Sequence, residues 1–158
     1  MSWPEPVERV AAFLRAAGAE ARLEELAAET PTARAAAEAI GCELDQIVKS
    51  IVFVCGAKPV LALVPGDRRA DAGKVAAAAG SAEAHIGSAS EVVAATGHAP
   101  GAVSPFPPPQ GLQILVERTV LSAPAVWVGA GSERHMARLT PAELVRLTRG
   151  LTVDLVAT

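Results

Sequence analysis

Residues 45–56, DQIVKSIVFVCG, decide the fold, because they join a run of β-branched and apolar residues to a single lysine. A second apolar run, PVLALVP at residues 59–65, follows the glycine- and proline-containing stretch GAKP. Runs of this composition between turn residues are typical of strands. The sequence therefore predicts two strands that pair with each other.

Alternation along the first strand, residues 47–55, places Lys49 on the same face as Ile51, Phe53 and Cys55. The opposite face is also mostly apolar, so this strand is predicted to run through the core and Cys55 to belong to it. A buried ammonium without a partner is costly. Lys49 must therefore reach water at the strand end, pair with an acid, or line a cavity that binds an anionic or polar substrate.

Capping and turn residues divide the rest of the chain into further elements. Helices are predicted at residues 5–18, 30–41, 71–80, 88–97 and 140–150, with Thr30, Ser88 and Thr140 as N-caps. Further strands are predicted at residues 112–117, 123–131 and 134–139. Because helices and strands neither alternate strictly nor segregate, the order predicts an α+β fold, with a mixed, partly barrel-like β-sheet flanked by helices.

Composition predicts one soluble, cytoplasmic domain over residues 1–158. The chain is 51% hydrophobic, its formal net charge is −3, and it has two cysteines. This charge argues against a histone-like DNA-binding protein. No apolar run approaches the roughly 18 residues of a membrane span, and the N-terminus lacks the apolar stretch of a signal peptide. The sequence has no C-x-x-C pattern and no complete dinucleotide fingerprint, so neither a metal nor a cofactor is expected.

Two stretches of small residues stand out as candidate recognition loops. In TGHAPGAVSPF, residues 96–106, two glycines and a proline leave main-chain groups open for hydrogen bonding. In VWVGAGSERH, residues 126–135, a strand runs into small residues that a ligand or another backbone can approach closely. Loops of either kind also occur where the chain only turns.

Taken in order, IVKSIVF, GHAPGAVSPF, ILVE and GAGS resemble the YbaK/ProX family of aminoacyl-tRNA editing deacylases. The resemblance runs from residue 30 to residue 147, and Pro31 and Thr32 match the family's usual entry segment. It implies that Lys49 lines the site at the terminal adenosine and that Gly101 acts beside it in catalysis. It further implies that the substrate is bound by Gly97, Pro100, Ser104, Gly129, Gly131 and Ser132.

This chain departs from the family pattern at two places. Glu117 stands where members often have aspartate, and PFPPPQG at residues 105–111 replaces a small-residue sequence. The second departure can reshape the pocket, so the identity of the substrate does not carry over from the family.

The function implied by the resemblance is hydrolysis of the ester that joins a wrong amino acid to tRNA. Such an ester is already activated and a ribose hydroxyl lies beside it, so no Ser-His-Asp triad is required. We expect a small amino acid, with alanyl-tRNA(Pro) first; Cys-tRNA(Pro) and tRNA that carries proline or threonine stay open as alternatives. Besides the tRNA 3′ end, a prolyl-tRNA synthetase is a candidate partner. Candidate contacts to the tRNA backbone are Arg68, Arg69, Lys74 and His135, although surface cations also serve solubility.

Two other functions fit the same residues. The first is a binding module that holds aminoacyl-tRNA, or a synthetase, without hydrolysis. The second is a small-molecule esterase that does not require tRNA.

Overall fold

The hairpin predicted around Lys49 forms the centre of the structure. In the computed structural model, which describes residues 3–158, β2 (Val48–Cys55) and β3 (Lys58–Pro65) pair antiparallel and place Lys49 opposite Val64. The two-residue connection uses Gly56, whose φ of 64° is in the region that favours glycine. The prediction of two paired strands is confirmed.

Three strands extend this hairpin into a five-stranded sheet of order β4-β2-β3-β5-β8. The short strand β4 (Ala84–Ile86) pairs antiparallel with β2, whereas β5 (Gln113–Glu117) is parallel to β3 and β8 (Leu151–Val153) is parallel to β5. The sheet is therefore mixed, as predicted.

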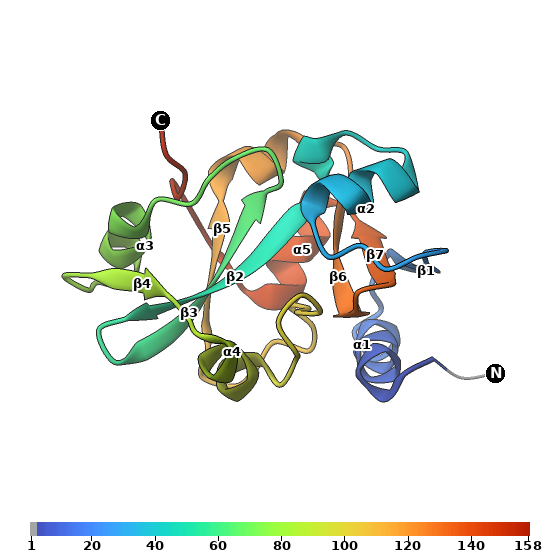
Figure 1. Cartoon of the computed structure of the whole chain (residues 1–158), viewed down its shortest axis with the longest axis horizontal. Coiled ribbons are helices and arrows are strands. Elements are labelled where there is room, and N and C mark those ends of the chain that lie inside the picture. Colours follow the sequence, from blue (N-terminus) through green and yellow to red (C-terminus); the bar gives the residue numbers. More distant parts are fainter. Residues whose placement is uncertain (1–2) are drawn as a thin grey trace.

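A second sheet, of order β1-β7-β6, packs beside the first. It consists of β1 (Ala21–Glu25), β7 (His135–Leu139) and β6 (Val126–Ser132), and its pairs are antiparallel. A bridge between Ile47 and Trp127 connects the start of β2 to this sheet. The predicted α+β class is confirmed, with the strands divided between two connected sheets (Figure 1).

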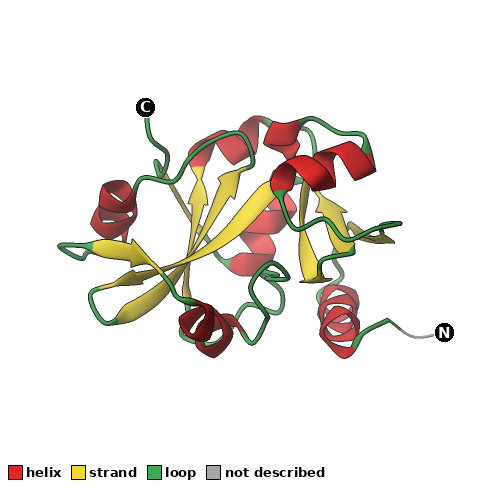
Figure 2. Ribbon diagram, viewed as in Figure 1, coloured by secondary structure: helices red, strands yellow, loops and turns green. Residues whose placement is uncertain are grey.

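Both faces of β2 are covered, as the alternation predicted. Val48 and Val52 join a core with Phe106 and Val128, while Phe53 and Cys55 on the other face join a second core. Figure 2 shows most helices at the periphery of the two sheets and one, α5 (Pro141–Thr148), in the middle of the view among the strands. No helix among residues 3–158 combines the length and the apolar character that a membrane crossing needs.

The five α-helices are α1 (Glu5–Ala16), α2 (Ala33–Ile40), α3 (Ala72–Ala79), α4 (Ala89–Thr96) and α5 (Pro141–Thr148); the 3-10 helices are η1 (Leu44–Gln46) and η2 (Arg118–Ser122). The predicted N-caps Ser88 and Thr140 accept hydrogen bonds from the main-chain N–H three residues on.

The predicted N-cap of α2 is wrong. Thr32 caps this helix, because the main-chain N–H and the hydroxyl of Thr30 both donate to the carbonyl of Glu133.

The predicted end of α5 is also displaced by one residue. The left-handed position after α5 is taken by Arg149, at φ 54°, rather than by Gly150. A Cβ on Gly150 would lie 2.6 Å from Cγ2 of Val116. Close packing therefore requires a glycine at position 150, and the left-handed turn falls on the arginine before it.

Candidate functional site

A cavity of ≈ 350 Å³ opens where the two sheets meet. Its walls come from the segment that leads into α2, the first half of β2, the loop after α4, β6 and β7; the lining residues are Thr30, Pro31, Thr32, Ala33, Ala36, Ile47, Val48, Lys49, Ser50, Gly101, Val103, Gly129 and Met136. Figure 1 shows α2 and the loop after α4 on opposite sides of the end of β2 that adjoins β6. The cavity thus brings together Lys49, Gly101 and Gly129, which come from three distant parts of the sequence.

Lys49 is partly buried, and its ammonium donates a hydrogen bond to the carbonyl oxygen of Arg68 over 2.7 Å. Burial lowers the pKa of Lys49, while Asp67 offsets part of this effect and Arg69 adds to it. An ammonium has three N–H donors. A single bond to Arg68 therefore leaves donors for a ligand.

The loop at residues 96–106, called the glycine loop below, reaches the cavity through Gly101 and Val103. Gly101 has φ 84°, and the Val103 carbonyl lies against β6 so closely that a Cβ on Gly129 would be 2.3 Å from its oxygen. Glycine at position 129 therefore allows the main chain of the loop at Val103 to pack directly against β6. The two stretches of small residues do meet, and they meet at one wall of the cavity.

Ser50 supplies a polar group that the sequence patterns did not indicate. Its side-chain oxygen is buried and has no hydrogen-bond partner within residues 3–158, although Ser50 lines the cavity. Buried hydroxyls are almost always paired. A single serine beside a lysine in an apolar strand is the signal that could have identified it.

The other predicted substrate-binding residues lie outside the cavity lining. Gly97 ends α4 in the left-handed conformation, and Pro100 is exposed one residue before Gly101. Ser104 is buried, and its hydroxyl accepts the N–H of Phe106. Gly131 allows close approach of α1, because a Cβ there would lie 2.9 Å from the carbonyl carbon of Pro6.

Ser132 and His135 form a pair in the turn between β6 and β7. The Ser132 hydroxyl lies 2.6 Å from Nδ1 of His135, while Nε2 of the same ring is 3.5 Å from a carboxylate oxygen of Glu25. The imidazole is 2% exposed and packs edge-on against Trp3. Burial lowers the pKa of His135, with Glu25 opposing this effect and Arg134 adding to it. The structure thus places His135 in the interior and not on a surface that meets phosphates.

His98, within the glycine loop, is a second buried histidine. It is 5% exposed, and its Nδ1 has no partner within the described chain. Burial lowers its pKa, which a hydrogen bond to the main chain of Phe106 partly offsets and Arg9 lowers further. The glycine loop therefore buries the imidazole of His98, and the lowered pKa favours the neutral form of this ring.

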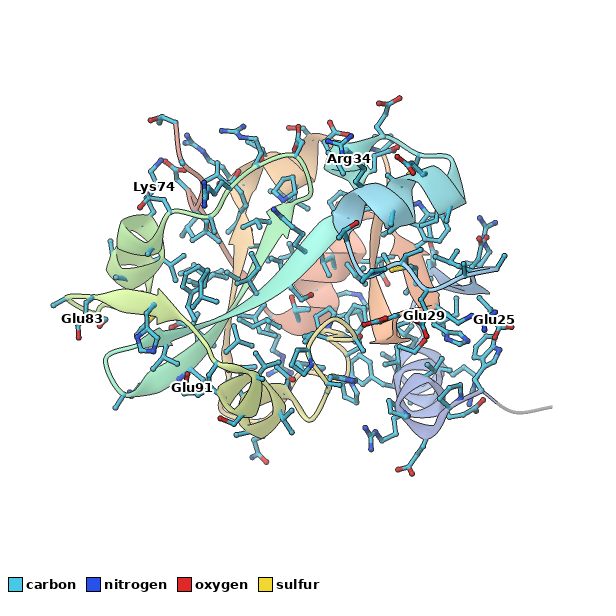
Figure 3. The ribbon with its side chains drawn as sticks, viewed as in Figure 1. Glu25, Glu29, Arg34, Lys74, Glu83 and Glu91 are labelled. Carbon is cyan, nitrogen blue, oxygen red and sulfur yellow. The ribbon has the colours of Figure 1, made fainter. Side chains whose placement is uncertain are left out.

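The cations that were predicted to bind tRNA differ in their exposure and in the hydrogen bonds that they make within the protein. Arg69 is exposed, whereas a guanidinium nitrogen of Arg68 lies 3.3 Å from the carbonyl oxygen of Ala157. Lys74 is held by Asp154 and the carbonyl of Val156, at 3.0 and 2.8 Å. Figure 3 shows Lys74 beside α3 at one end of the molecule and Arg34 on α2 nearer the middle. Exposed Arg34 directly follows the cavity residue Ala33 and was missed in the sequence.

Glu117 serves the fold and does not line the cavity. It is fully buried, and its carboxylate accepts the N–H groups of Leu155 and Thr119 at 2.8 and 2.7 Å. Burial raises the pKa of Glu117, but these hydrogen bonds outweigh burial and the pKa is lowered. The glutamate thus fastens the C-terminal segment to the end of β5.

A larger hollow of ≈ 660 Å³ lies elsewhere, between α1, the proline-rich loop at residues 108–112 and the end of α5. None of the residues predicted to bind or act on substrate lines it. Within residues 3–158, no group of three or more His, Cys, Asp or Glu side chains is placed to hold a metal ion.

Comparison with known proteins shows the family to which the chain belongs. A family model described as "Aminoacyl-tRNA editing domain" matches residues 27–147. The chain is 34% identical over 107 residues to a "Proline--tRNA ligase" of Xanthomonas campestris pv. campestris, over 66% of this chain and 19% of the ligase. It therefore spans about a fifth of that relative.

Two further relatives match over most of their length. The "Putative Cys-tRNA(Pro)/Cys-tRNA(Cys) deacylase EbsC" of Enterococcus faecalis is 30% identical over 121 residues, which are 75% of this chain and 73% of that protein. A solved structure described as a "putative trans-editing enzyme for prolyl tRNA synthetase" superposes with a TM-score of 0.91 at 36% identity, over 99% of this chain and 100% of the other. The chain belongs to the YbaK/ProX family of aminoacyl-tRNA editing domains.

Proposed function

We propose that this protein hydrolyses the ester of mischarged tRNA that carries a small amino acid, with residues 1–158 acting as one editing domain in trans. The observation that carries the proposal is the cavity in which Lys49, Gly101 and Gly129 converge. Alanyl-tRNA(Pro) is the first candidate substrate. Cys-tRNA(Pro) is the second, because the name of the Enterococcus relative includes it.

The residues at the cavity support hydrolysis that needs no protein nucleophile. The ester is activated, and the neighbouring ribose hydroxyl can position water once the substrate is held in place. The Lys49 ammonium would bind the ribose or phosphate of the terminal adenosine and stabilise negative charge as the tetrahedral intermediate forms. The main-chain amide of Gly101 or of its neighbours would polarise the carbonyl.

The walls of the cavity favour selection by size. Met136, Val103 and Ala36 are apolar lining residues, while Gly129 and Val103 are in close backbone contact. A pocket of this kind discriminates by only about 1–3 kcal/mol per methylene. Alanine and cysteine are the natural candidates, and a larger side chain would have to displace the wall.

Cations near the cavity support binding of the tRNA backbone. Arg34 and Arg69 are exposed, and Arg69 belongs to the loop that holds the Lys49 ammonium. We propose these two arginines as phosphate contacts, with Arg68 beside them. A prolyl-tRNA synthetase remains the candidate partner, because relatives carry its name.

The experiment is deacylation of a panel of mischarged tRNAs, including alanyl- and cysteinyl-tRNA(Pro), by wild type and Lys49→Ala. Lys58→Ala is the matched control, because Lys58 is exposed at the turn of the same hairpin. We expect fast release of one small amino acid by wild type and the control, and a loss of about 100-fold or more in Lys49→Ala.

Full activity in folded Lys49→Ala would refute the role of the lysine. Binding of aminoacyl-tRNA without release across the panel would replace the hydrolase with the binding module. Equal rates on free aminoacyl esters and on charged tRNA would instead identify an esterase.

A further inference from the structure

Glu133 lies beside the cavity and contacts lining residues of two of its walls. It lies in the turn between β6 and β7, and its carbonyl oxygen accepts the N–H and the hydroxyl of Thr30 at 2.7 and 2.9 Å. Its carboxylate points toward the glycine loop, where Oε1 lies 2.8 Å from the position that a Cβ on Gly101 would occupy. Both Thr30 and Gly101 line the cavity. One residue therefore fixes one wall through its main chain and presents an anion at the other.

This carboxylate has no cation assigned to it. No described residue between positions 3 and 158 forms an ion pair with Glu133. The neighbouring Arg134 directs its guanidinium to the carbonyl oxygens of Leu26 and Ala27. A carboxylate beside a substrate cavity is thus available to a cation that the protein does not supply.

The cavity consequently has a cation in its lining and an anion directly beside it. Lys49 places a cation on the β2 wall, and Glu133 places an anion at Gly101. An aminoacyl ester of adenosine has the opposite arrangement, with an α-ammonium on the amino acid and a phosphate on the nucleoside. Charge complementarity of this kind fixes orientation and rejects the reversed ligand.

We propose that Glu133 binds the α-ammonium of the aminoacyl group and so restricts the substrate to esters with a free α-amine. This inference rests on the proposed function, since it names the substrate class of the same site. N-acylated esters, including peptidyl esters, lack the ammonium and leave the carboxylate unpaired. Glycine at position 101 has a reason in this arrangement, because a side chain there would occupy the space of the carboxylate.

The test uses two non-hydrolysable ligands of nearly equal shape. One is 3′-deoxy-3′-(L-alanylamino)adenosine, and the other carries L-lactoyl in place of L-alanyl, so that a neutral hydroxyl replaces the ammonium. Their affinities are measured by calorimetry for wild type, Glu133→Gln and the control Glu38→Gln. Glu38 is exposed on α2, so the control makes the same change of charge away from the cavity.

We expect wild type and the control to bind the alanyl ligand about tenfold or more tightly than the lactoyl ligand, as for a charge-assisted hydrogen bond. In Glu133→Gln this ratio should fall to about one, while the affinity for the lactoyl ligand is kept. Retention of that affinity shows that the wall held by the Glu133 carbonyl is intact. A wild-type ratio that persists in Glu133→Gln, or a wild type without preference, overturns the proposal.

Hydrolysis assays on the same preparations separate this inference from the proposed function. If wild type deacylates alanyl-tRNA(Pro) but the ratio of the affinities for the alanyl and lactoyl ligands is the same in Glu133→Gln, the inference is wrong and the proposed hydrolase function stands. If the ratio depends on Glu133 but no ester is cleaved, ammonium recognition stands and the protein is a binding module.

Discussion

Gly129→Ala should disable the candidate site while leaving the fold in place. A Cβ at this position would lie 2.3 Å from the carbonyl oxygen of Val103, and ordinary contact begins at 3.4 Å. The oxygen must therefore retreat by about 1.1 Å. The obstacle is main chain and cannot be relieved by a change of rotamer, and the φ of Gly129 is outside the left-handed region, so the effect is steric alone.

The displaced segment carries Gly101 only two residues before Val103. A shift of about 1 Å in a positioned group can cost roughly 100-fold in rate. Overpacking of this kind costs about 1–3 kcal/mol of stability. We therefore expect kcat/KM for deacylation to fall by about 100-fold, and the free energy of unfolding to fall by about 1–3 kcal/mol.

Gly18→Ala is the matched control for this loss of stability. Gly18 has φ 64° with nothing within 4 Å of the position that a Cβ would occupy, and it follows α1, outside the cavity lining. The substitution should cost about 1–2 kcal/mol through the backbone alone and leave kcat/KM unchanged. Urea titration and single-turnover deacylation measure the two effects separately. Wild-type activity in Gly129→Ala would refute the claim that the contact with β6 positions the glycine loop.

Three further predictions concern stability. Burial lowers the pKa of His98 and of His135 in the folded chain. Near the unperturbed histidine pKa of about 6.5, the unfolded chain therefore binds more protons than the folded chain. The stability from these neutral histidines is present above that pH and is lost as the pH falls through the lower folded values; urea titrations that show no loss between about pH 8 and pH 5 would contradict this. Glu117→Gln should lower the free energy of unfolding by about 2–3 kcal/mol, since an amide replaces the acceptor of two N–H groups; a change no larger than in the exposed control Glu38→Gln would count against it. Arg149→Gly should raise the melting temperature by relieving a left-handed residue worth about 1 kcal/mol, and an unchanged melting temperature would show that position 149 is unstrained.

The parts of the fold that were predictable from sequence are the locally determined ones. The β2–β3 hairpin follows from composition and a short turn, and α3 and α4 begin and end at the expected capping residues. By contrast, β1, β4 and β8 were not predicted. They are three to five residues long, and β1, with the sequence ARLEE, has only two apolar residues, Ala21 and Leu23, which is too short an alternation to indicate a strand. Such strands exist because a long-range partner pairs with them.

The candidate site was predictable only where chemistry is visible in single residues. Lys49 stands out as a charge in an apolar strand, and alternation placed it correctly among the neighbours on its face. Ser104 and Gly131 look like recognition residues for the same reason that they are useful in packing, because both are small. The serine beside Lys49 was a weaker signal of the same kind and was overlooked. The carboxylate of Glu133 was not predictable, because its place beside Gly101 depends on a long-range contact that sequence spacing does not report.

The position of the Lys49 ammonium depends on the far end of the chain. It is held by the carbonyl of Arg68, and the next carbonyl, that of Arg69, accepts the N–H of Ala157 over 2.8 Å. The guanidinium of Arg68 in turn reaches the carbonyl of Ala157. A lysine in a central strand would otherwise turn toward water at considerable entropic advantage. Because the C-terminal segment fixes the loop that offers this carbonyl, it takes part in placing the charge on which the proposed chemistry rests.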